Sequence, residues 1–245
     1  MSRKLFSKSP REIKLIKKAV EISNSCLSLI EKSLKEEISE IELRRRIRRK
    51  INSRGATLAF QTIVASGKRS AEIHAKPRAT EKIIEGIGYV DFGARYKGYC
   101  SDLTVPFIKG KISSKERKIV QTTVKAYEIA VNSIEVGKYW WEPFDKVNKF
   151  LKKNNFKMQH SLGHGIGKNI HERPTITVPS KKRLKIRRIR KKREKFMKRK
   201  LSENMIFTIE PAIYVKGFGG CRIENDILLT RKGPKVLSKA RLIQV

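Results

Sequence analysis

The chain has 245 residues, which suits one large domain or two small ones and is enough to bury a substantial core. It carries 58 Lys and Arg against 23 Asp and Glu, and the resulting net charge of +35 attracts polyanions such as RNA, ribosomes or acidic membranes. A Lys- and Ile-rich proteome bias explains this charge equally well. The three cysteines are widely spaced, which argues against a disulfide framework, and no segment resembles a signal peptide or has the ~20 apolar residues of a membrane span. We therefore expect a cytoplasmic protein without a transmembrane helix.

The first part of the chain predicts helices followed by strands. Ser9-Pro10-Arg11-Glu12 is a capping box, and apolar residues at near-helical spacing extend a first helix to about Leu34. A second helix opens at Ser39; its Arg-rich face is usually just solvated, although such a face can also touch nucleic acid. Strands are then predicted over residues 57–66, 88–95 and 99–107.

The second part of the chain predicts two further helices, over residues 114–134 and 141–154. A Gly- and His-rich strand and loop region follows at 158–170, and strands return at 205–214 and 221–230. This order favours an α+β domain in which helices cover one face of a curved antiparallel sheet.

A polybasic insertion, residues 179–203, differs in kind from the rest. Its core, Lys181 to Lys200, reads KKRLKIRRIRKKREKFMKRK, with Glu194 as the only acid. The commoner explanation is a charged surface segment. The functional alternative is an electrostatic anchor for RNA or a ribosome. Because aromatic residues are nearly absent, the segment does not support sequence-specific reading of RNA.

Two aspartates face each other in the first predicted hairpin. Asp91 and Asp102 are equidistant from a turn at Tyr96-Lys97, just before Gly98. Residues equidistant from a hairpin turn lie opposite each other on one face of the sheet. Two carboxylates at that separation repel, and a metal ion between them removes the conflict.

Glu210 and Glu224 repeat this arrangement about a Gly-rich turn centred on Gly217. Both acids lie within apolar strand sequence, where an unpaired carboxylate is costly. Two hairpins that each present a pair of acids predict a pseudo-symmetric sheet with a site between its halves.

Histidines add an independent indication. Three of the four in the chain, His160, His164 and His171, fall within HSLGHGIGKNIHE, and the fourth is His74. A single histidine among apolar residues is usually structural, but a cluster among glycines is less easily explained in that way. Imidazole combined with carboxylates suits Mn, Co, Zn or Fe, whereas an all-oxygen site suits Mg or Ca.

Four segments together resemble the metal-site motifs of the pita-bread metallopeptidases, a family that includes methionine aminopeptidase, prolidase and aminopeptidase P. They are VDFGARYKGYCSDLT, SLGHGIGKNIHERP, MIFTIEPAIY and GGCRIENDILLT. The resemblance runs from about Ser9 to Leu237. It implies a pita-bread fold formed by a single catalytic domain over residues 1–245, with residues 1–8 as an N-terminal tail.

The resemblance implies a dinuclear site for two divalent metals, with Mn or Co expected first and Zn or Fe as alternatives. All five ligand positions carry the expected residue types. One metal would be chelated by Asp91 and the other held by His164 and Glu210, with both bridged by Asp102 and Glu224. A water held between the metals would be the nucleophile, with its pKa lowered toward neutrality.

The resemblance also implies roles around the metals. Glu210 looks like the acid/base that moves the water proton, and His171 like the residue that steadies the tetrahedral intermediate. His74 matches a position that contacts the substrate near its scissile amide. His160 and Arg222 match the substrate-binding positions of the branch that cleaves before proline, and a guanidinium at Arg222 can also orient carboxylates.

We therefore expect a metal-dependent exopeptidase that hydrolyses the bond before proline in Xaa-Pro peptides. Proline-cleaving relatives usually have a further N-terminal domain, and a catalytic domain without one is more typical of methionine aminopeptidase, which is the alternative. A third hypothesis, from a different class, is a non-catalytic relative that binds RNA or a ribosome. Such relatives usually lose ligands, and this chain retains all five.

Overall fold

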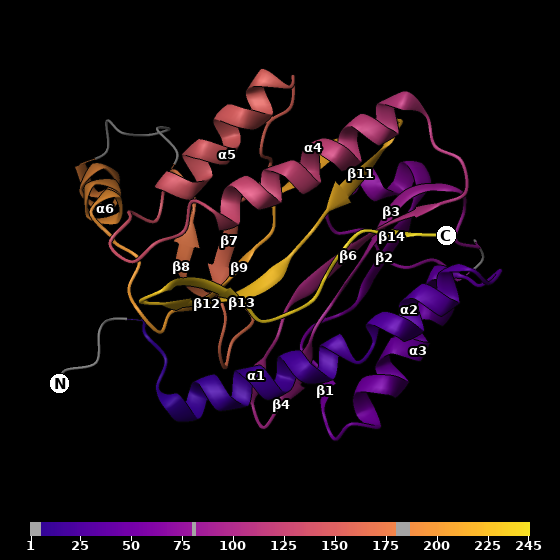
Figure 1. Ribbon diagram of the computed structural model, residues 1–245, viewed down its shortest axis with the longest axis horizontal. Helices are drawn as coiled ribbons and strands as arrows, with labels where there is room; N and C mark the ends of the chain where they lie inside the picture. The colour runs from indigo at the N-terminus through magenta and orange to yellow at the C-terminus, as the bar shows by residue number, and fades with distance from the viewer. Residues whose placement is uncertain (1–5, 80–81, 180–186) are drawn as a thin grey trace.

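The computed structural model describes residues 6–79, 82–179 and 187–245 (Figure 1). Strands occupy the middle of the molecule, with α1, α2 and α3 along one side and α4 and α5 along the other (Figure 1). The α+β prediction is confirmed. Helices cover the strands from two sides, each group packing on its own half of the sheet structure.

The N-terminal helices are α1 (Pro10–Asn24), α2 (Leu27–Leu34) and α3 (Glu40–Asn52). The predicted capping box is present, since the Ser9 side chain and Glu12 exchange hydrogen bonds with each other's backbone. The predicted single helix to Leu34 is wrong, because the chain breaks after Asn24. There the Ser25 hydroxyl donates to the carbonyl of Ile22 at 2.7 Å and competes for the regular helical bond.

The first half of the sheet structure contains a four-stranded sheet and a three-stranded sheet. Two of the predicted strands are each divided into two, at Gly93 and at Ser101-Asp102, and the strand predicted over 57–66 is also in two pieces. The strands are β1 (Thr57–Leu58), β2 (Ile63–Ser66), β3 (Gly86–Phe92), β4 (Ala94–Tyr96), β5 (Tyr99–Cys100), β6 (Leu103–Lys109) and β14 (Ile243–Gln244), with the 3-10 helix η1 (Gly67–Ala71) after β2. Their orders are β14-β6-β3-β2 and β1-β4-β5, and only the pairing of β14 with β6 is parallel.

The second half follows the helices α4 (Ser114–Val131) and α5 (Glu142–Lys153). Its sheets have the orders β13-β12-β9-β7-β8 and β10-β11. The elements are β7 (Gly163–Gly165), β8 (Glu172–Ile176), α6 (Arg187–Met197), β9 (Ile206–Ile209), β10 (Ala212–Val215), β11 (Gly219–Arg222), β12 (Asn225–Thr230) and β13 (Gly233–Val236).

The register of the first hairpin differs from the prediction. Tyr96 pairs with Tyr99, so the turn is Lys97-Gly98, whose φ angles of +46° and +84° suit a tight hairpin turn. Asp91 therefore pairs with Thr104 and not with Asp102. The predicted register is wrong by two residues, but an even shift leaves side chains on the same face of a sheet. Asp91 and Asp102 become diagonal neighbours on that face.

The register of the second hairpin agrees with the prediction. Val215 pairs with Gly219 around a turn centred on Gly217, and Ile209 pairs with Asn225 in the same register. Glu210 and Glu224 fall between these paired segments, directly opposite each other. Strand pairing is interrupted at both acids, as it is at Asp102 in the first hairpin.

A β-bridge between Thr104 and Glu224 joins the two halves. The backbone N–H of Glu224 donates to Thr104 O at 3.1 Å, and Thr104 N–H donates back at 3.3 Å. This bridge brings the interrupted part of one hairpin against the other, which places the acids of both at one junction. One apolar core lies between α1–α3 and the first half, and a second lies between α4–α5 and the second half.

The remaining features concern the ends and the surface. Among the described residues, no helix combines the length and apolar character needed to cross a bilayer. Cys26, Cys100 and Cys221 are free and buried, so the prediction that they form no disulfide framework is confirmed.

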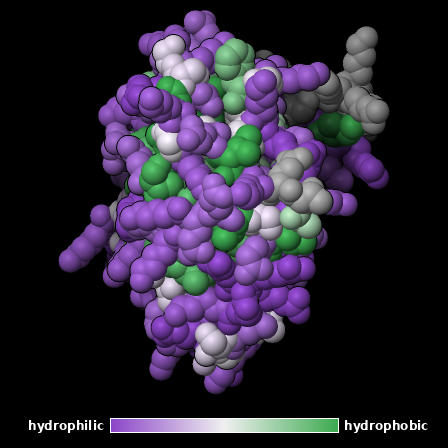
Figure 2. Space-filling model, turned by 90° about the vertical axis from the view of Figure 1, so that its right-hand side faces the viewer, coloured by the Kyte–Doolittle hydropathy of each residue, from purple (hydrophilic) through white to green (hydrophobic). Residues whose placement is uncertain are grey.

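Of the predicted tail, residues 1–5 lie outside the described residues, whereas Ser7 and Lys8 are buried against the body. Hydrophilic residues cover most of the face in Figure 2.

Within the polybasic insertion, residues 180–186 lie outside the part of the chain that the structure describes. The residues that follow form α6, which lies at one end of the molecule beside the first turns of α5 (Figure 1). The Trp141 indole donates to Met197 O at 3.2 Å, and the Trp140 and Phe196 rings meet edge to face at 5.6 Å. This part of the insertion is therefore anchored to the body by aromatic residues.

Candidate metal centre

A cavity of about 570 Å³ opens where the two hairpins meet. It is lined by every residue that the sequence analysis proposed for the site. The proposed ligands are Asp91, Asp102, His164, Glu210 and Glu224, and the proposed substrate residues are His74, His160, His171 and Arg222. Their roles stay predictions, but residues up to 150 positions apart in the chain share one pocket.

Three of the proposed ligands already have the spacing of a metal site. Three potential ligand atoms lie within 4.8 Å of one another, one each from Asp102, His164 and Glu224. The His164 Nε2 atom is 3.6 Å from Asp102 Oδ2 and 3.7 Å from Glu210 Oε1. These separations are too long for hydrogen bonds and leave room for an ion among the donors.

Asp91 is held at the side of this cluster by Arg222. The Arg222 guanidinium donates to Asp91 Oδ2 at 2.5 Å, to Thr104 Oγ1 at 3.1 Å and to Tyr214 Oη at 2.5 Å. It also lies 4.4 Å from the centre of the Tyr89 ring. Most of its donors are thus engaged within the protein, so orienting Asp91 is the role that these contacts support.

The buried carboxylates fit a divalent cation. Asp91 Oδ1 and Asp102 Oδ1 are buried and have no hydrogen-bond partner among the described residues. Burial, followed by the charge of Glu224, raises the pKa of Asp102 and of Glu210 well above the usual range. Burial likewise raises the pKa of Glu224 to about 7. A divalent ion would supply the missing partner and compensate the repulsion among these groups.

His164 has the protonation state that a metal ligand needs. Its Nδ1 is 3.1 Å from Gly165 O, and because a carbonyl only accepts, Nδ1 carries the proton. The lone pair of Nε2 then faces Asp102 and Glu210. Burial, with the adjacent His171, lowers the pKa of His164 to about 4, so the ring is neutral near pH 7.

Two glycines allow β7 to carry His164 into the cavity. A Cβ atom on Gly163 would lie 1.9 Å from Thr208 O, and one on Gly165 would lie 2.2 Å from Arg173 O. Any side chain at either position would push β7 away from its neighbouring strands. The glycines therefore set the depth of His164.

The other three histidines surround the cluster at different depths. His160 Nδ1 donates to Ser161 O at 2.7 Å, and burial lowers the pKa of this ring to about 4. His171 is exposed, and its ring lies edge to face with His164 at 4.3 Å. His74 is also exposed. His74 and His171 are thus at the cavity mouth, where a substrate can reach them.

Sequence reasoning missed three polar residues that support the site. Thr104 donates to Glu224 Oε2 at 2.7 Å, and the Tyr214 hydroxyl contacts His160 Nε2 at 3.2 Å. Asp226 accepts from the backbone N–H of Asp102 at 3.0 Å and is fully buried. An acid within the apolar strand sequence NDILL was the available signal for Asp226. No local signal identifies the other two.

Comparison with known proteins supports a family assignment. The sequence model of one family, described as metallopeptidase family M24, matches residues 14–231. The chain is 33% identical over 237 residues to an Xaa-Pro dipeptidase of Pyrococcus horikoshii, covering 95% of this chain and 62% of that protein. It therefore spans about three fifths of the length of this relative.

Solved structures agree with the sequence comparison. The fold superposes on an X-Pro aminopeptidase of Thermotoga maritima with a TM-score of 0.84 at 31% identity, over 98% of this chain and 65% of that one. An Xaa-Pro dipeptidase of Bacillus anthracis gives 0.85 at 33% identity, over 98% and 64%. These similarities confirm the predicted pita-bread fold. From its motifs, its fold and the extent of these matches, the chain belongs to metallopeptidase family M24.

Proposed function

We propose that this protein is a metal-dependent exopeptidase that hydrolyses the bond before proline in Xaa-Pro peptides. The observation that carries the proposal is the convergence of four buried acids and a neutral imidazole in one cavity. Divalent ions held by these residues would acidify a water and polarise the scissile carbonyl. We expect two ions, Mn or Co, held by Asp91, Asp102, His164, Glu210 and Glu224.

Glu210 is placed to move protons during hydrolysis. Burial and the neighbouring Glu224 raise its pKa, so it can accept a proton near neutral pH. Its Oε2 lies 3.6 Å from His160 Nδ1, and Oε1 faces His164. We propose that Glu210 takes the proton of the attacking water and passes it to the departing amine.

The exposed histidines suit the substrate. A ring N–H of His171 beside the cluster is available to stabilise the negative charge that develops on the carbonyl oxygen. His74, across the mouth, is available to contact the amide being cleaved. Arg222 acts on the reaction through Asp91, as a positioning residue.

Preference for proline is supported by the match of His160 and Arg222 to the motifs of the proline-cleaving branch, and by the Xaa-Pro activities named for the relatives. Those names include dipeptidases and an aminopeptidase, which differ in whether residues follow the proline. A peptide series therefore separates the possibilities.

The test uses protein stripped with EDTA and reloaded with Mn or Co, assayed on Ala-Pro, Ala-Pro-Ala and Met-Ala-Ser. We expect cleavage of the proline peptides, and the ratio of the first two distinguishes dipeptidase from aminopeptidase. His164→Ala is the control and should lose both activity and bound metal. Release of Met from Met-Ala-Ser without action on the proline peptides would instead assign a methionine aminopeptidase. A metal-loaded protein that cleaves none of the three would contradict catalysis.

A further inference from the structure

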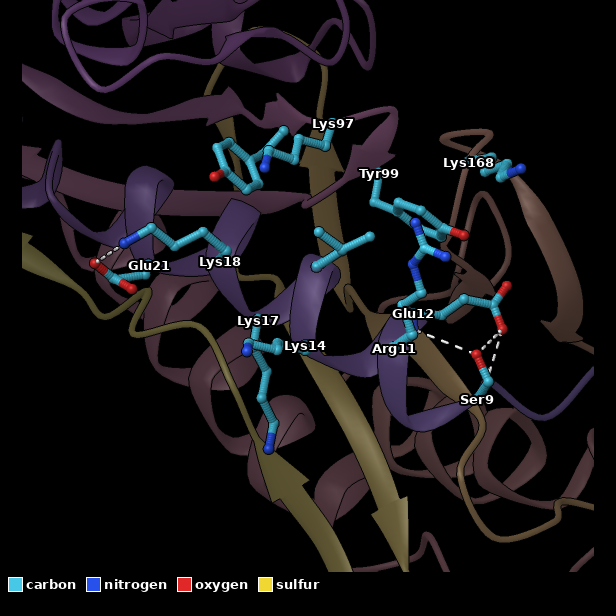
Figure 3. Close-up of a pocket in the computed structure, with 12 residues that line it drawn as sticks. Ser9, Arg11, Glu12, Lys14, Lys17, Lys18, Glu21, Lys97, Tyr99 and Lys168 are labelled. Carbon is cyan, nitrogen blue, oxygen red and sulfur yellow. Dashed lines mark hydrogen bonds and ion pairs between the residues drawn. The ribbon is translucent and has the colours of Figure 1, made fainter.

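A large basic groove lies outside the metal centre, and the proposed peptidase reaction does not use it. Its volume is about 990 Å³, and it shares no lining residue with the metal-site cavity. Figure 3 shows that its cations come from three separate elements: α1, the turn between β4 and β5, and the loop after β7. They are Arg11, Lys14, Lys17, Lys18, Lys97 and Lys168, and we call this feature the α1 groove.

The charge of the α1 groove is largely uncompensated. Its lining holds six cations and two acids. Glu12 is engaged in the capping box with Ser9, and Glu21 pairs with Lys18 at 2.7 Å (Figure 3). Within the part of the chain that the structure describes, none of the other five cations forms an ion pair. The groove therefore presents a concentrated positive field to solvent.

The Arg-rich face of α3 provides a contrast. Its arginines are also numerous, but Arg46 pairs with Glu36 at 2.7 Å and Arg49 pairs with Glu42 at 3.0 Å. Glu36 and Glu42 thus offset only part of the charge of the six Lys and Arg side chains on that helix. The α1 groove differs because its cations come from three separate elements and line one hollow.

The groove has the dimensions and side chains that suit a narrow polyanion. Arg11, Lys14 and Lys18 follow one face of α1 over about 10 Å, at 1.5 Å per residue. A stacked strand carries a phosphate about every 3.4 Å, so this face spans about three nucleotides. A flat bilayer would meet only the rims of such a groove.

A tyrosine on the opposite wall favours a nucleic acid over other polyanions. Tyr96 and Tyr99 flank the Lys97-Gly98 turn and line the groove. Tyr99 is only 9% exposed and packs in an apolar core, whereas Tyr96 is half-buried and is the ring that a base can reach. The Lys97 ammonium lies 5.6 Å from the Tyr96 ring centre. A positively charged groove with an exposed aromatic face is the usual arrangement for single strands, because bases stack on the ring.

We propose that the α1 groove binds the backbone of a single-stranded nucleic acid, with a base against Tyr96. The contact is independent of sequence and depends strongly on salt. The groove shares no lining residue with the metal-site cavity or with the pocket beside α6. Nucleic acid bound here leaves the peptidase cavity open.

The test is fluorescence anisotropy with labelled 12-nucleotide oligo(U) and oligo(dT), between 50 and 200 mM NaCl, on the full chain. The groove variant is Lys14→Gln/Lys97→Gln/Lys168→Gln, and the matched control is Lys191→Gln/Lys195→Gln/Lys198→Gln on and after α6. All six lysines are exposed, and both variants lose three charges. Comparison of the two probes shows whether the strand is RNA, DNA or either.

We expect the groove variant to bind at least about tenfold more weakly than the wild type. The slope of log binding constant against log NaCl concentration should become shallower by about 2, because three phosphate contacts at about 0.7 each are lost. The control variant should change by less than about twofold, and the cleavage rate of Ala-Pro should be the same in all three proteins. The proposal can thus fail while the peptidase function stands.

Several results would overturn the proposal. Equal losses in the two variants would show that net charge alone attracts the strand, and a loss only in the control would move the contact to α6. Tighter groove-dependent binding to vesicles of acidic phospholipid or to poly-glutamate would identify a different partner. Polyphosphate competing as well as oligo(U), with Tyr96→Leu unchanged, would exclude base stacking.

Discussion

At the residue scale, Arg222 illustrates how this site handles buried charge. It is 3% exposed, and its strongest contact is the buried carboxylate of Asp91. Removal of one partner of such a pair leaves the other charge uncompensated in the interior, which costs about 3–5 kcal/mol. The proposed metal would compensate the same carboxylate. Arg222 and the metal therefore have overlapping electrostatic roles.

This overlap predicts a metal-dependent effect of Arg222→Met. In EDTA the variant should lose about 3–5 kcal/mol of unfolding free energy in urea, and with excess Mn the loss should be clearly smaller. Arg69→Met is the matched control, because Arg69 pairs with the buried Glu40 and neither residue lines the metal-site cavity. Its loss should be the same with and without Mn. If Mn reduced the loss of unfolding free energy equally in both variants, the result would argue against Asp91 as a ligand.

A second prediction at this scale concerns protons. Burial and mutual repulsion raise the pKa values of Asp102, Glu210 and Glu224, the last to about 7, so in the metal-free site these groups hold protons as pH falls below neutrality. His164, with its pKa lowered to about 4, holds none there. Metal binding requires the carboxylates to be ionised. Protons should therefore be released on binding, and Mn affinity should rise with pH.

The measurement is calorimetric titration of metal-free protein with Mn at pH 6.5 and pH 8, each in two buffers of different ionisation enthalpy. Proton release should be larger at pH 6.5, because more of the carboxyl groups are protonated there. Heats that do not depend on the buffer at pH 6.5 would contradict the raised carboxylate pKa values.

At the scale of the element, β7 shows how a strand delivers a ligand. Gly163 packs against Thr208 O so closely that a methyl group cannot be added without moving the strand. His164 follows directly in the chain, so displacement of β7 would move the imidazole relative to Asp102. The precision of the site therefore depends on residues with no chemistry of their own.

Gly163→Ala should consequently weaken Mn binding at least about tenfold and destabilise the fold by about 1–3 kcal/mol. Gly137→Ala is the control, since a Cβ at Gly137 meets nothing within 4 Å, while strain at its φ of +94° costs a comparable amount of about 1–3 kcal/mol. The control should leave metal binding unchanged. Metal content by mass spectrometry and urea unfolding measure the two effects. Normal Mn affinity in Gly163→Ala would show that β7 does not set the position of His164.

At the scale of the whole molecule, the net charge of +35 sets the response to salt. Like charges spread over the surface repel in the compact state, and salt screens that repulsion with a Debye length of about 10 Å at 0.1 M. The buried pair of Arg222 and Asp91 is shielded from this screening. We expect NaCl from 50 to 300 mM to raise the unfolding midpoint.

The measurement is thermal unfolding of metal-loaded protein across this range, with an uncharged solute of equal osmolality as the control. The control should leave the midpoint nearly unchanged. A midpoint that falls with NaCl would mean that surface ion pairs, such as Arg46 with Glu36, outweigh the repulsion.

Local chemistry explains what the sequence determined by itself. The capping box at Ser9, the turn centred on Gly217 and the register that follows from it depend on a few neighbouring residues. The family motifs identified the acids and histidines that line the cavity, and the family and the pita-bread fold are confirmed by the comparisons. The local elements and the motifs can both be read from the sequence, because a cap, a turn or a motif depends only on residues that are close together in the chain.

Tertiary structure decided the remainder, because it depends on contacts between residues far apart in the chain. The first hairpin register depends on a two-residue turn, and the bridge between Thr104 and Glu224 has no signature in either segment. The pairing of Arg222 with Asp91 joins residues 131 positions apart. The α1 groove likewise forms only when α1 packs beside Lys97 and Lys168. The sequence gives the number of Lys and Arg residues, but only the fold shows which of them gather on one surface.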